Sequence, residues 1–400
     1  MKLYFMRLVD DSLGMVFCKL LWWTVKIKRI FCPSRTTADP QKVKAILCQK
    51  YFGLGSIIHT APVLKGLRQH YPNAKIIYMT IKSQRDIVHL AQMADEILLV
   101  RMDSIILFIK DVLKNLLYLT RQRIDVSLDF EFFSKFTMIV SLLSGAKIRV
   151  GLHQKRIRPE GIMTHSIYFN HYKHISEIYF AFGRALNIER KPGFYDSLLP
   201  SLKDLYGETL RKKLGINKVK PIIVINVNAS KLFKYRRWPA GNFVELIRLL
   251  IDEHPENYYV MIGAKSEYSY VEDICKRVKY KDNQLINCAG RTTLKELLAL
   301  IEMSYLMITN DSGPLHIADA YGKNIAAFYG PETPVVYGPS HTKNALIFYS
   351  ENVYCSPCLN VYDSKKCLYG EVCEDNICMS EIKSNMVFKK ICKVFFQPKE

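Results

Sequence analysis

Short apolar runs alternate with segments of helical periodicity along most of the chain. In the first half, Gly, Pro or charged residues bound each apolar run, which is typical of short buried strands. These predicted strands are "KAILCQKY" (44–51), "AKIIYMT" (74–80), "DEILLV" (95–100) and "IDVSLDF" (124–130). Helical patterns are found over 56–70, 84–92, 104–120 and 134–143. Strands that alternate with helices predict a parallel sheet covered on both faces.

A second alternating set begins at residue 221. Its predicted strands are "PIIVINVN" (221–228), "YYVMIGA" (258–264), "NQLINCAG" (283–290), "YLMIT" (305–309) and "NIAAFYG" (324–330). The predicted helices are 242–254, 267–278, 294–302 and 314–321. The segment 189–219 fits neither set, and its Pro192, Gly193 and Pro200 predict a connection between two domains.

The pattern predicts an α/β protein with two doubly wound, Rossmann-like domains. We place the N-terminal domain at 36–200 and the C-terminal domain at 215–345. Residues 346–400 are predicted to form a cysteine-containing tail and a C-terminal helix that packs back toward the N-terminal domain. Ligands of open α/β sheets bind at the carboxyl ends of the strands, so two such domains facing each other are expected to enclose a cleft there.

The first thirty-five residues match neither a signal peptide nor a membrane span. The apolar core at 16–25 is shorter than the roughly 20 residues that span a bilayer, and no small-residue cleavage site follows it. Trp22 and Trp23 lie beside lysines. We therefore predict that residues 1–35 form an amphipathic helix in a membrane interface, where each Lys or Arg adds about 1 kcal/mol of attraction to an anionic leaflet. A helix packed on its own domain is the alternative.

The formal net charge of +20 indicates an anionic partner. Nucleic acid, an acidic membrane surface and a phosphorylated substrate all fit this charge. The basic residues are dispersed and no recognised nucleic-acid motif is present, so nucleic acid is the weakest of the three. Six of the eleven cysteines are scattered singly along the chain, which indicates a reducing compartment rather than a disulfide scaffold.

The stretch "NDSGPLHIADAYG" places small and polar residues directly after the predicted strand "YLMIT". Pro314 suits the first turn of a helix, so Ser312 and Gly313 are expected at its N-terminus, where unpaired N–H groups and the helix dipole attract an anion. His316 lies one turn further, and Asp311 is placed to accept from a sugar hydroxyl or to orient the loop. The pattern predicts a phosphate site, with ordinary capping by Asp311 or Ser312 as the alternative.

A basic loop, "NASKLFKYRRWP", follows the first predicted strand of the C-terminal domain. Ser230 lies in its polar turn, and Lys234 and Arg236 bring positive charge to the sheet edge that holds Asp311. Charge at this edge would bind a diphosphate, whereas a solvated basic loop is the alternative. Glu267, just past the next strand, is placed either to accept from a ribose diol or to act as a first-turn carboxylate.

The segment "QKYFGLGSIIHTAP" joins a strand, a G-x-G turn and a helix in the N-terminal domain. It lacks the third glycine of a dinucleotide fingerprint, so the turn alone does not predict a dinucleotide site. It does place Gly53, Gly55, Ser56 and His59 at the expected mouth of the cleft.

These motifs together resemble family 9 glycosyltransferases, the heptosyltransferase-like enzymes of bacterial cell-surface polysaccharide assembly. The resemblance runs from about residue 43 to 382 and rests on "FGLGSIIHTAPVLKGLRQHYPNAKI", "RRWP", "GAKSE" and "NDSGPLHIADAYGKNIAAFYGPETP", in that order. It implies a GT-B architecture, with the nucleotide sugar mainly on the second domain and the acceptor on the first. It also implies an inverting reaction without metal or cofactor at the inner face of the cytoplasmic membrane, often with ADP-heptose as donor.

The resemblance also assigns roles by position. Ser230 lies in the phosphate turn, Arg236 stands where the family has a lysine that contacts phosphate, and Glu267 matches the ribose-binding acid. The donor sugar and diphosphate site corresponds to Asp311, Ser312, Gly313 and His316.

Ser56 departs from the family pattern, because the heptosyltransferases have an aspartate there that is thought to be the general base. A serine hydroxyl does not take a proton near neutral pH. Asp129 and Glu131, at a strand end of the same domain, are candidate replacements, unless they are only helix-start carboxylates. His59 is the other candidate, since imidazole titrates near physiological pH.

The sequence thus predicts a transferase that moves a heptose or similar sugar from a nucleotide-diphosphate donor to a lipopolysaccharide-core or lipid-linked acceptor at an anionic membrane. A non-catalytic sugar-nucleotide-binding protein, which Ser56 permits, and a nucleotide-sugar epimerase are the alternatives. The clustered C-terminal cysteines either pack in a reduced tail, which their irregular spacing favours, or bind a structural zinc. They are Cys355, Cys358, Cys367, Cys373 and Cys378.

Overall fold

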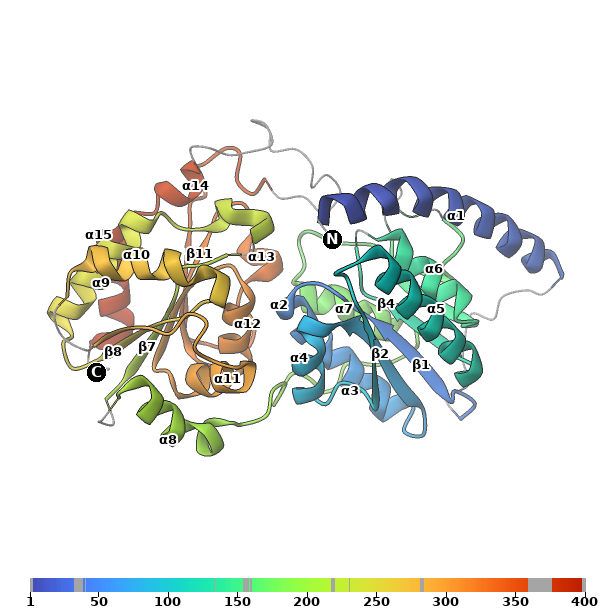
Figure 1. Ribbon diagram of the computed structural model, residues 1–400, viewed down its shortest axis with the longest axis horizontal. Helices are drawn as coiled ribbons and strands as arrows, with labels where there is room; N and C mark the ends of the chain where they lie inside the picture. The colour runs from blue at the N-terminus through green and yellow to red at the C-terminus, as the bar shows by residue number, and fades with distance from the viewer. Residues whose placement is uncertain are drawn as a thin grey trace. The chain divides into compact units, whose positions relative to one another are not determined.

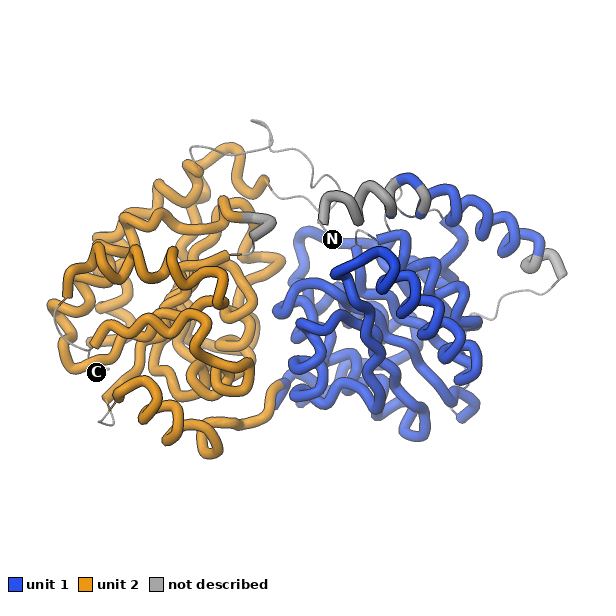
Figure 2. The backbone as a smooth tube through the Cα atoms, in the orientation of Figure 1, with its two compact units in different colours: residues 1–198 blue, residues 199–400 orange. Residues whose placement is uncertain are grey.

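The computed structural model describes residues 3–31, 39, 41–132, 134–153, 158, 160–216, 220–229, 231–280, 284–358 and 376–397, without the side chains of 3–9, 11, 13, 28–31 and 231–233. The chain divides into two units, residues 1–198 and 199–400 (Figure 2). Each unit is built on a parallel sheet with helices packed against it, as the alternating pattern predicts (Figure 1).

The sheet of unit 1 has six strands in its described residues, in the order β3-β2-β1-β4-β5-β6. The first four lie in predicted runs, because continuous apolar residues suit strands buried on both faces. β5 and β6 were not predicted, since Arg149 and Gly151 interrupt the apolar run of β5 and β6 has only 3 residues. The strands are β1 (Ala45–Gln49), β2 (Lys75–Ile81), β3 (Glu96–Val100), β4 (Val126–Asp129), β5 (Ile148–Leu152) and β6 (His165–Ile167).

The helix predicted over 56–70 is divided into two. The Thr60 hydroxyl donates to the carbonyl of Ile57 at 2.7 Å, and Pro62 lies in the first turn of a new helix, where its missing N–H costs nothing. The helices that follow the strands of unit 1 are α2 (Leu54–Ile58), α3 (Ala61–His70), α4 (Arg85–Leu90), α5 (Ile105–Gln122), α6 (Lys135–Leu143) and α7 (Ile175–Arg184).

The N-terminal helix α1 (Leu3–Phe31) packs along α6 (Figure 1). Asp10 accepts hydrogen bonds from the backbone N–H groups of Lys135 and Phe136, each at 2.9 Å, so a carboxylate of α1 caps the N-terminus of α6. Cys18 is buried beside Met138 in a small core between the two helices. One face of α1 therefore packs on its own unit. Among the described helices, none is long and apolar enough to cross a membrane.

The described residues of unit 2 hold a second six-stranded parallel sheet, in the order β12-β11-β10-β7-β8-β9. β7 and β10 pair at its centre, so their carboxyl ends lie side by side at one edge. All the runs predicted for this domain form strands, and β12 is an additional one. The strands are β7 (Ile222–Asn226), β8 (Tyr258–Met261), β9 (Leu285–Asn287), β10 (Leu306–Asn310), β11 (Asn324–Tyr329) and β12 (Ala345–Tyr349).

Helices of unit 2 connect these strands and continue beyond the last one. Trp238, just before α9, is fully buried in the core of unit 2 and stacks on Phe328 at 4.3 Å between ring centroids. The helices are α8 (Lys203–Leu214), α9 (Ala240–Glu253), α10 (Tyr268–Val278), α11 (Leu294–Met303), α12 (Gly313–Ala320), α13 (Pro334–Tyr337), α14 (Ile377–Ser380) and α15 (Ser384–Ile391).

The C-terminal segment, which the sequence predicts to pack back toward the N-terminal domain, makes its described contacts within unit 2. α15 packs against α9, and Met379, Val387 and Ile391 belong to the core of unit 2. The Trp238 indole N–H donates to the carbonyl of Ile382 at 2.8 Å, which fixes the segment between α14 and α15 to the same unit. The apolar face of α15 is thus buried against α9 and the core of unit 2.

Candidate active site

The loop after β10 begins a helix with no side-chain cap at its N-terminus. Ser312 occupies the N-cap of α12 in extended conformation, and Pro314 lies in the first turn. The Ser312 hydroxyl does not accept from the helix backbone. It accepts instead from the Asn226 amide at 2.7 Å, and it donates to the carbonyl of Asn310 at 3.1 Å. The capping alternative therefore does not describe Ser312, and the first-turn N–H groups keep their attraction for an anion.

Two asparagines at the ends of β7 and β10 hold this loop in place. Asn226 also donates to the Thr309 hydroxyl at 3.1 Å. The Asn310 side chain accepts from the N–H of Trp238 at 2.9 Å and donates to the carbonyl of Asn228 at 3.3 Å, so it joins the two loops that end the central strands. Sequence reasoning did not assign roles to these side chains. An asparagine that ends a buried apolar strand is the signal that identifies them.

Arg236 lies between two carboxylates of the same unit. Its Nη1 is 3.1 Å from Asp311 Oδ2, and its Nη2 is 2.7 Å from Glu332 Oε1. Burial raises the pKa of Glu332 to about 8, against the opposing effect of the Arg236 guanidinium. Sequence reasoning placed Arg236 on a phosphate but missed Glu332, which lies in "GPETP" after β11. The guanidinium is thus held at the edge of the loop by two acids.

His316 lies one turn into α12 and is buried, with 6% of its surface exposed. Burial lowers its pKa, with Asp311 and Asp319 acting in the opposite direction. The imidazole is therefore neutral at physiological pH, and a neutral ring has one N–H donor to offer. Gly313, the first residue of α12, completes the loop that the sequence predicts as the diphosphate site.

The remaining residues predicted to bind the sugar donor lie on neighbouring loops. Glu267 accepts from the N–H of Ala264 at 2.8 Å and lies 3.8 Å from the Arg237 guanidinium, which stacks on Tyr270. Lys234 is exposed. Ser230 lies outside the described residues. The structure thus brings Arg236, Asp311, Ser312, Gly313 and His316 into one loop cluster, with Glu267 on the loop after β8.

The G-x-G turn of unit 1 leads into the short helix α2. Gly53 has a φ of 84°, in the left-handed region, and a Cβ there would meet the Ser56 hydroxyl at 3.0 Å. Gly55 is buried, whereas Ser56 is partly exposed and its hydroxyl hydrogen-bonds with the phenol of Tyr179. The Ser56 hydroxyl therefore lies in the first turn of α2, directly after the Gly53 turn.

Glu131 is bonded to the start of this loop. Its Oε1 accepts from the N–H groups of Tyr51 and Phe52 at 2.6 and 3.0 Å, and its Oε2 pairs with the Lys50 ammonium at 3.0 Å. Only 5% of its surface is exposed. His59, also buried, lies edge-on to His174 with 5.1 Å between ring centroids.

Asp129, the other candidate base, is enclosed within unit 1. Its side chain is fully buried, and its Oδ2 accepts from Arg158 at 2.7 Å and from the Thr137 hydroxyl at 2.8 Å. Burial raises its pKa, with Arg158 acting against the shift. The sequence placed Asp129 correctly at a strand end, but the returning Arg158 pairs with it inside unit 1. Its side chain is fully enclosed, whereas 7% of the Glu131 side chain is exposed, so Asp129 is the less accessible of the two carboxylates to an acceptor hydroxyl.

The cysteine residues seen in the structure carry free thiols. Cys378 is buried in the core of unit 2, and Cys355 packs against that core. Cys367 and Cys373 lie outside the described residues. In the part of the chain that the structure describes, no group of three or more His, Cys, Asp or Glu side chains has the arrangement of a metal site.

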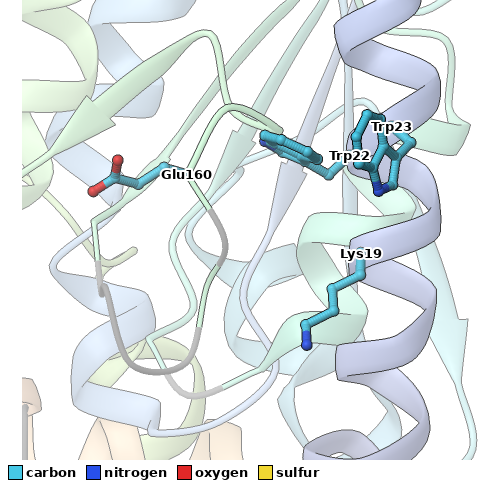
Figure 3. Close-up of a pocket in the computed structure, with 4 residues that line it drawn as sticks. All are labelled: Lys19, Trp22, Trp23 and Glu160. Carbon is cyan, nitrogen blue, oxygen red and sulfur yellow. The ribbon is translucent and has the colours of Figure 1, made fainter.

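A cavity of about 430 Å³ lies in unit 1, apart from the loops described above. Figure 3 shows Trp22 and Lys19 extending from α1 toward the segment that carries Glu160. Trp23 completes the lining. The cavity thus belongs to the α1 side of the unit and not to the strand ends.

Comparison with known proteins gives a consistent result. The family model of glycosyltransferase family 9 (heptosyltransferase) matches residues 131–369, more than half of the chain. Lipooligosaccharide heptosyltransferase 2 of Campylobacter jejuni serotype O:6 is 24% identical over 345 residues, which cover 85% of this chain and 96% of the relative. Lipopolysaccharide core heptosyltransferase OpsX of Haemophilus influenzae is 23% identical over 317 residues, covering 77% and 86%.

Solved structures share the fold. A family 9 glycosyl transferase from Veillonella parvula is 20% identical with a TM-score of 0.72, over 91% of this chain and 100% of that one. The ADP-heptose lps heptosyltransferase II of E. coli is 19% identical with a TM-score of 0.68, over 89% and 99%. These folds agree with the GT-B architecture that the sequence motifs imply. The chain therefore belongs to glycosyltransferase family 9, the heptosyltransferase family.

Proposed function

We propose that the protein transfers a heptose or a similar sugar from a nucleotide-diphosphate donor, ADP-heptose in the first instance, to a lipopolysaccharide-core or lipid-linked acceptor. The observation that carries this proposal is the uncapped start of α12 beside the Arg236 guanidinium. The names of the relatives support it, since they are lipooligosaccharide and lipopolysaccharide heptosyltransferases. The reaction would be inverting and independent of metal.

The donor would bind to unit 2 through its diphosphate. Backbone N–H groups at Ser312 and Gly313 and the Arg236 guanidinium are fixed before any ligand arrives, so they stabilise charge without reorganisation. Charge develops on the diphosphate as the bond to the sugar breaks. Neutral His316 would donate one further hydrogen bond, and Glu267 would accept from the ribose. Lys234 and Ser230, which follow β7 in the sequence, would make further contacts with the phosphates.

The acceptor would bind to unit 1 at the loop of Gly53, Gly55 and Ser56. Its hydroxyl oxygen would attack the anomeric carbon from the side opposite the diphosphate. One glycosidic bond forms, the bond to the diphosphate breaks, and the hydroxyl proton passes to a base. We assign that base to Glu131, because its carboxylate is bonded to the backbone directly before this loop. His59 is the second candidate.

A mutational assay separates these roles. Purified protein is incubated with ADP-heptose and a lipopolysaccharide core that lacks the accepting heptose, and ADP release and acceptor mass are followed. As base, Glu131→Gln lowers kcat by about 10²–10⁴ with little change in KM. A higher KM with unchanged kcat would make Glu131 a positioning residue only. The same kcat loss in His59→Gln, with Glu131→Gln active, would assign the base to His59.

The donor side is tested by nucleotide binding. Arg236→Gln should weaken ADP binding strongly, whereas Lys276→Gln, which removes an exposed charge on α10, should not. A thermal-shift screen of ADP-, GDP- and UDP-sugars identifies which nucleotide the sugar donor carries. Equal ADP binding by wild type and Arg236→Gln would contradict the proposed diphosphate site.

A second candidate function is a non-catalytic member that binds nucleotide sugars. The feature in its favour is Ser56, at the position where the family resemblance implies an aspartate. ADP-heptose binding without ADP release on any core acceptor would establish this function. Restored transfer in Ser56→Asp would show in addition that the missing carboxylate is the cause.

We also propose that α1 holds the protein at the inner face of the cytoplasmic membrane. Its outer face carries the exposed side chains of Val16, Leu20, Trp23 and Ile27. Lys26 lies over the rings of Trp22 and Trp23. Such a helix, apolar on its outer face with tryptophans and lysines along it, is typical of an interfacial helix. Loss of vesicle binding after deletion of residues 1–35 tests the assignment.

A further inference from the structure

Helix α5 in unit 1 is apolar on two faces, of which only one is buried. Toward the sheet, Phe108, Val112 and Leu116 pack against the core formed with β1, β2 and β3. Away from the sheet, a second row of apolar side chains remains exposed. It consists of Ile106, Ile109, Leu113 and Leu117, whose exposed fractions are 76, 50, 62 and 54%.

The spacing of this outer row is helical. Positions 106, 109, 113 and 117 recur at three and four residues, so their side chains lie along one line of α5. A surface helix of a soluble domain usually presents charged and polar residues on that side. Exposed apolar side chains gathered in one row indicate a surface that contacts another apolar phase.

Basic side chains run beside the outer row. Lys110, Lys114 and Arg121 are exposed and follow one another at four and seven residues, on the flank of the row. The acid of α5, Asp111, is bonded to Arg101 through both oxygens, at 2.7 and 2.8 Å, so its charge is compensated. Long basic side chains beside apolar ones fit a bilayer, because the chain is buried while the charge stays at the headgroups.

Helices α5 and α1 share α6 as a neighbour. Both helices contact α6, α1 along its length and α5 through Phe108 and Phe136, whose ring centroids are 4.9 Å apart. Figure 1 shows α1, α5 and α6 on the same side of the sheet of unit 1. The connections from β3 through α5 to β4 and from β4 through α6 to β5 run in the same direction across the sheet, so right-handed crossovers place both helices on one face.

We propose that α5 is a second membrane-binding helix, and that its outer row and the outer face of α1 together dock unit 1 on an anionic lipid bilayer. This inference rests on the membrane assignment of α1 made above and adds a surface to it. Charge complementarity selects the occupant, since the lysines and arginine beside the row face anionic headgroups and the chain carries a net charge of +20. Two separated contacts fix the orientation of unit 1, which a single helix leaves free to rotate about its axis.

Vesicle sedimentation of the full chain tests the proposal, with phosphatidylcholine vesicles that contain or lack phosphatidylglycerol. Ile106→Ser/Leu113→Ser should weaken binding to the anionic vesicles at least tenfold. Lys110→Gln/Lys114→Gln should weaken it by more than tenfold at low salt, about fivefold per lysine, and leave binding to the neutral vesicles unchanged. The matched control is Leu205→Ser/Val394→Ser, which removes exposed apolar side chains from unit 2 and should bind as wild type does.

The possible outcomes distinguish membrane binding by α5 from membrane binding by α1, and both from the transfer reaction. Wild-type vesicle binding by the α5 variants, together with loss of binding in Leu20→Ser/Trp23→Ser, would overturn the role of α5. A wild-type dimer that Ile106→Ser/Leu113→Ser converts to a monomer with unchanged vesicle binding would also overturn it, and would make the row a contact between copies. Vesicle binding needs neither the sugar donor nor the acceptor. The binding test of α5 therefore remains valid even if the protein does not catalyse the proposed transfer.

Discussion

The Arg236 cluster leads to a prediction about stability and pH. A single guanidinium lies 3.1 Å from Asp311 and 2.7 Å from Glu332, and it cannot neutralise two buried carboxylates at once. Burial raises the pKa of Glu332 to about 8, and repulsion from Asp311 adds to a shift that Arg236 only partly opposes. Glu332→Gln replaces the carboxyl by a neutral group of the same shape, which imitates its protonated form. We predict that the variant gains stability over the wild type as the pH rises.

The magnitude follows from the two pKa values of Glu332. In the unfolded chain the group titrates near 4.5, so between pH 4.5 and about 8 the folded protein holds a proton that the unfolded chain has lost. Linkage then lowers the free energy of unfolding of the wild type by about 1.4 kcal/mol per pH unit. Below pH 4.5 both states hold the proton, and above pH 8 neither does. The variant should therefore gain about 3 kcal/mol at pH 7 and about 5 kcal/mol above pH 8, relative to its difference from wild type at pH 4.5.

Urea unfolding at each pH from 5 to 9 measures the difference between variant and wild type. Taking the difference removes the contribution of other groups, such as His316, whose lowered pKa makes the folded state lose stability as the pH falls through 6.5 and below. Glu208→Gln, at a carboxylate whose side chain is 83% exposed on α8, serves as the control for the same chemical change at the surface. Parallel stability curves for Glu332→Gln and wild type would refute the shared-guanidinium argument.

Three further outcomes follow from single contacts. Ser312→Ala removes the hydroxyl held by Asn226 and should weaken ADP binding about tenfold by calorimetry, with little change in the unfolding midpoint; unchanged affinity would exclude a role for that hydroxyl. Asp10→Ala removes the acceptor for two N–H groups of α6 and should cost about 1–2 kcal/mol in urea unfolding. Trp238→Phe loses the bond to Ile382 and should cost about 2 kcal/mol, with earlier proteolysis after α14; wild-type proteolysis would show that the tail is held by other contacts.

Much of the fold could be predicted from the sequence because most of its strands are continuous apolar runs bounded by Gly, Pro or charged residues. β5 was not predicted because Arg149 lies inside it. This side chain is buried, and its guanidinium donates hydrogen bonds to the backbone carbonyls of Ala146 and Ile162. A charged residue in a strand removes the apolar signal, and its partners are known only once the chain has folded. The contact of α15 with α9 could not be predicted for a related reason: an apolar face indicates burial but not the surface that buries it.

The candidate site was likewise predictable only in part. Asp311, Ser312 and His316 follow a strand directly, and the strand-end rule places them correctly at the sheet edge. The pairing of Arg236 with Glu332 joins loops 96 residues apart, and no local pattern predicts it. Asp129 also ends a strand, yet Arg158 returns to enclose it. The rule therefore locates a side chain at the edge, while its exposure depends on what the rest of the chain brings to it.

A crystal structure of the full chain with ADP would show directly where the diphosphate binds. We expect it at the start of α12, with its oxygens within hydrogen-bond distance of the backbone N–H groups at Ser312 and Gly313 and of the Arg236 guanidinium. A diphosphate bound elsewhere, with Arg236 still paired to both carboxylates and α12 unoccupied at its N-terminus, would contradict this expectation.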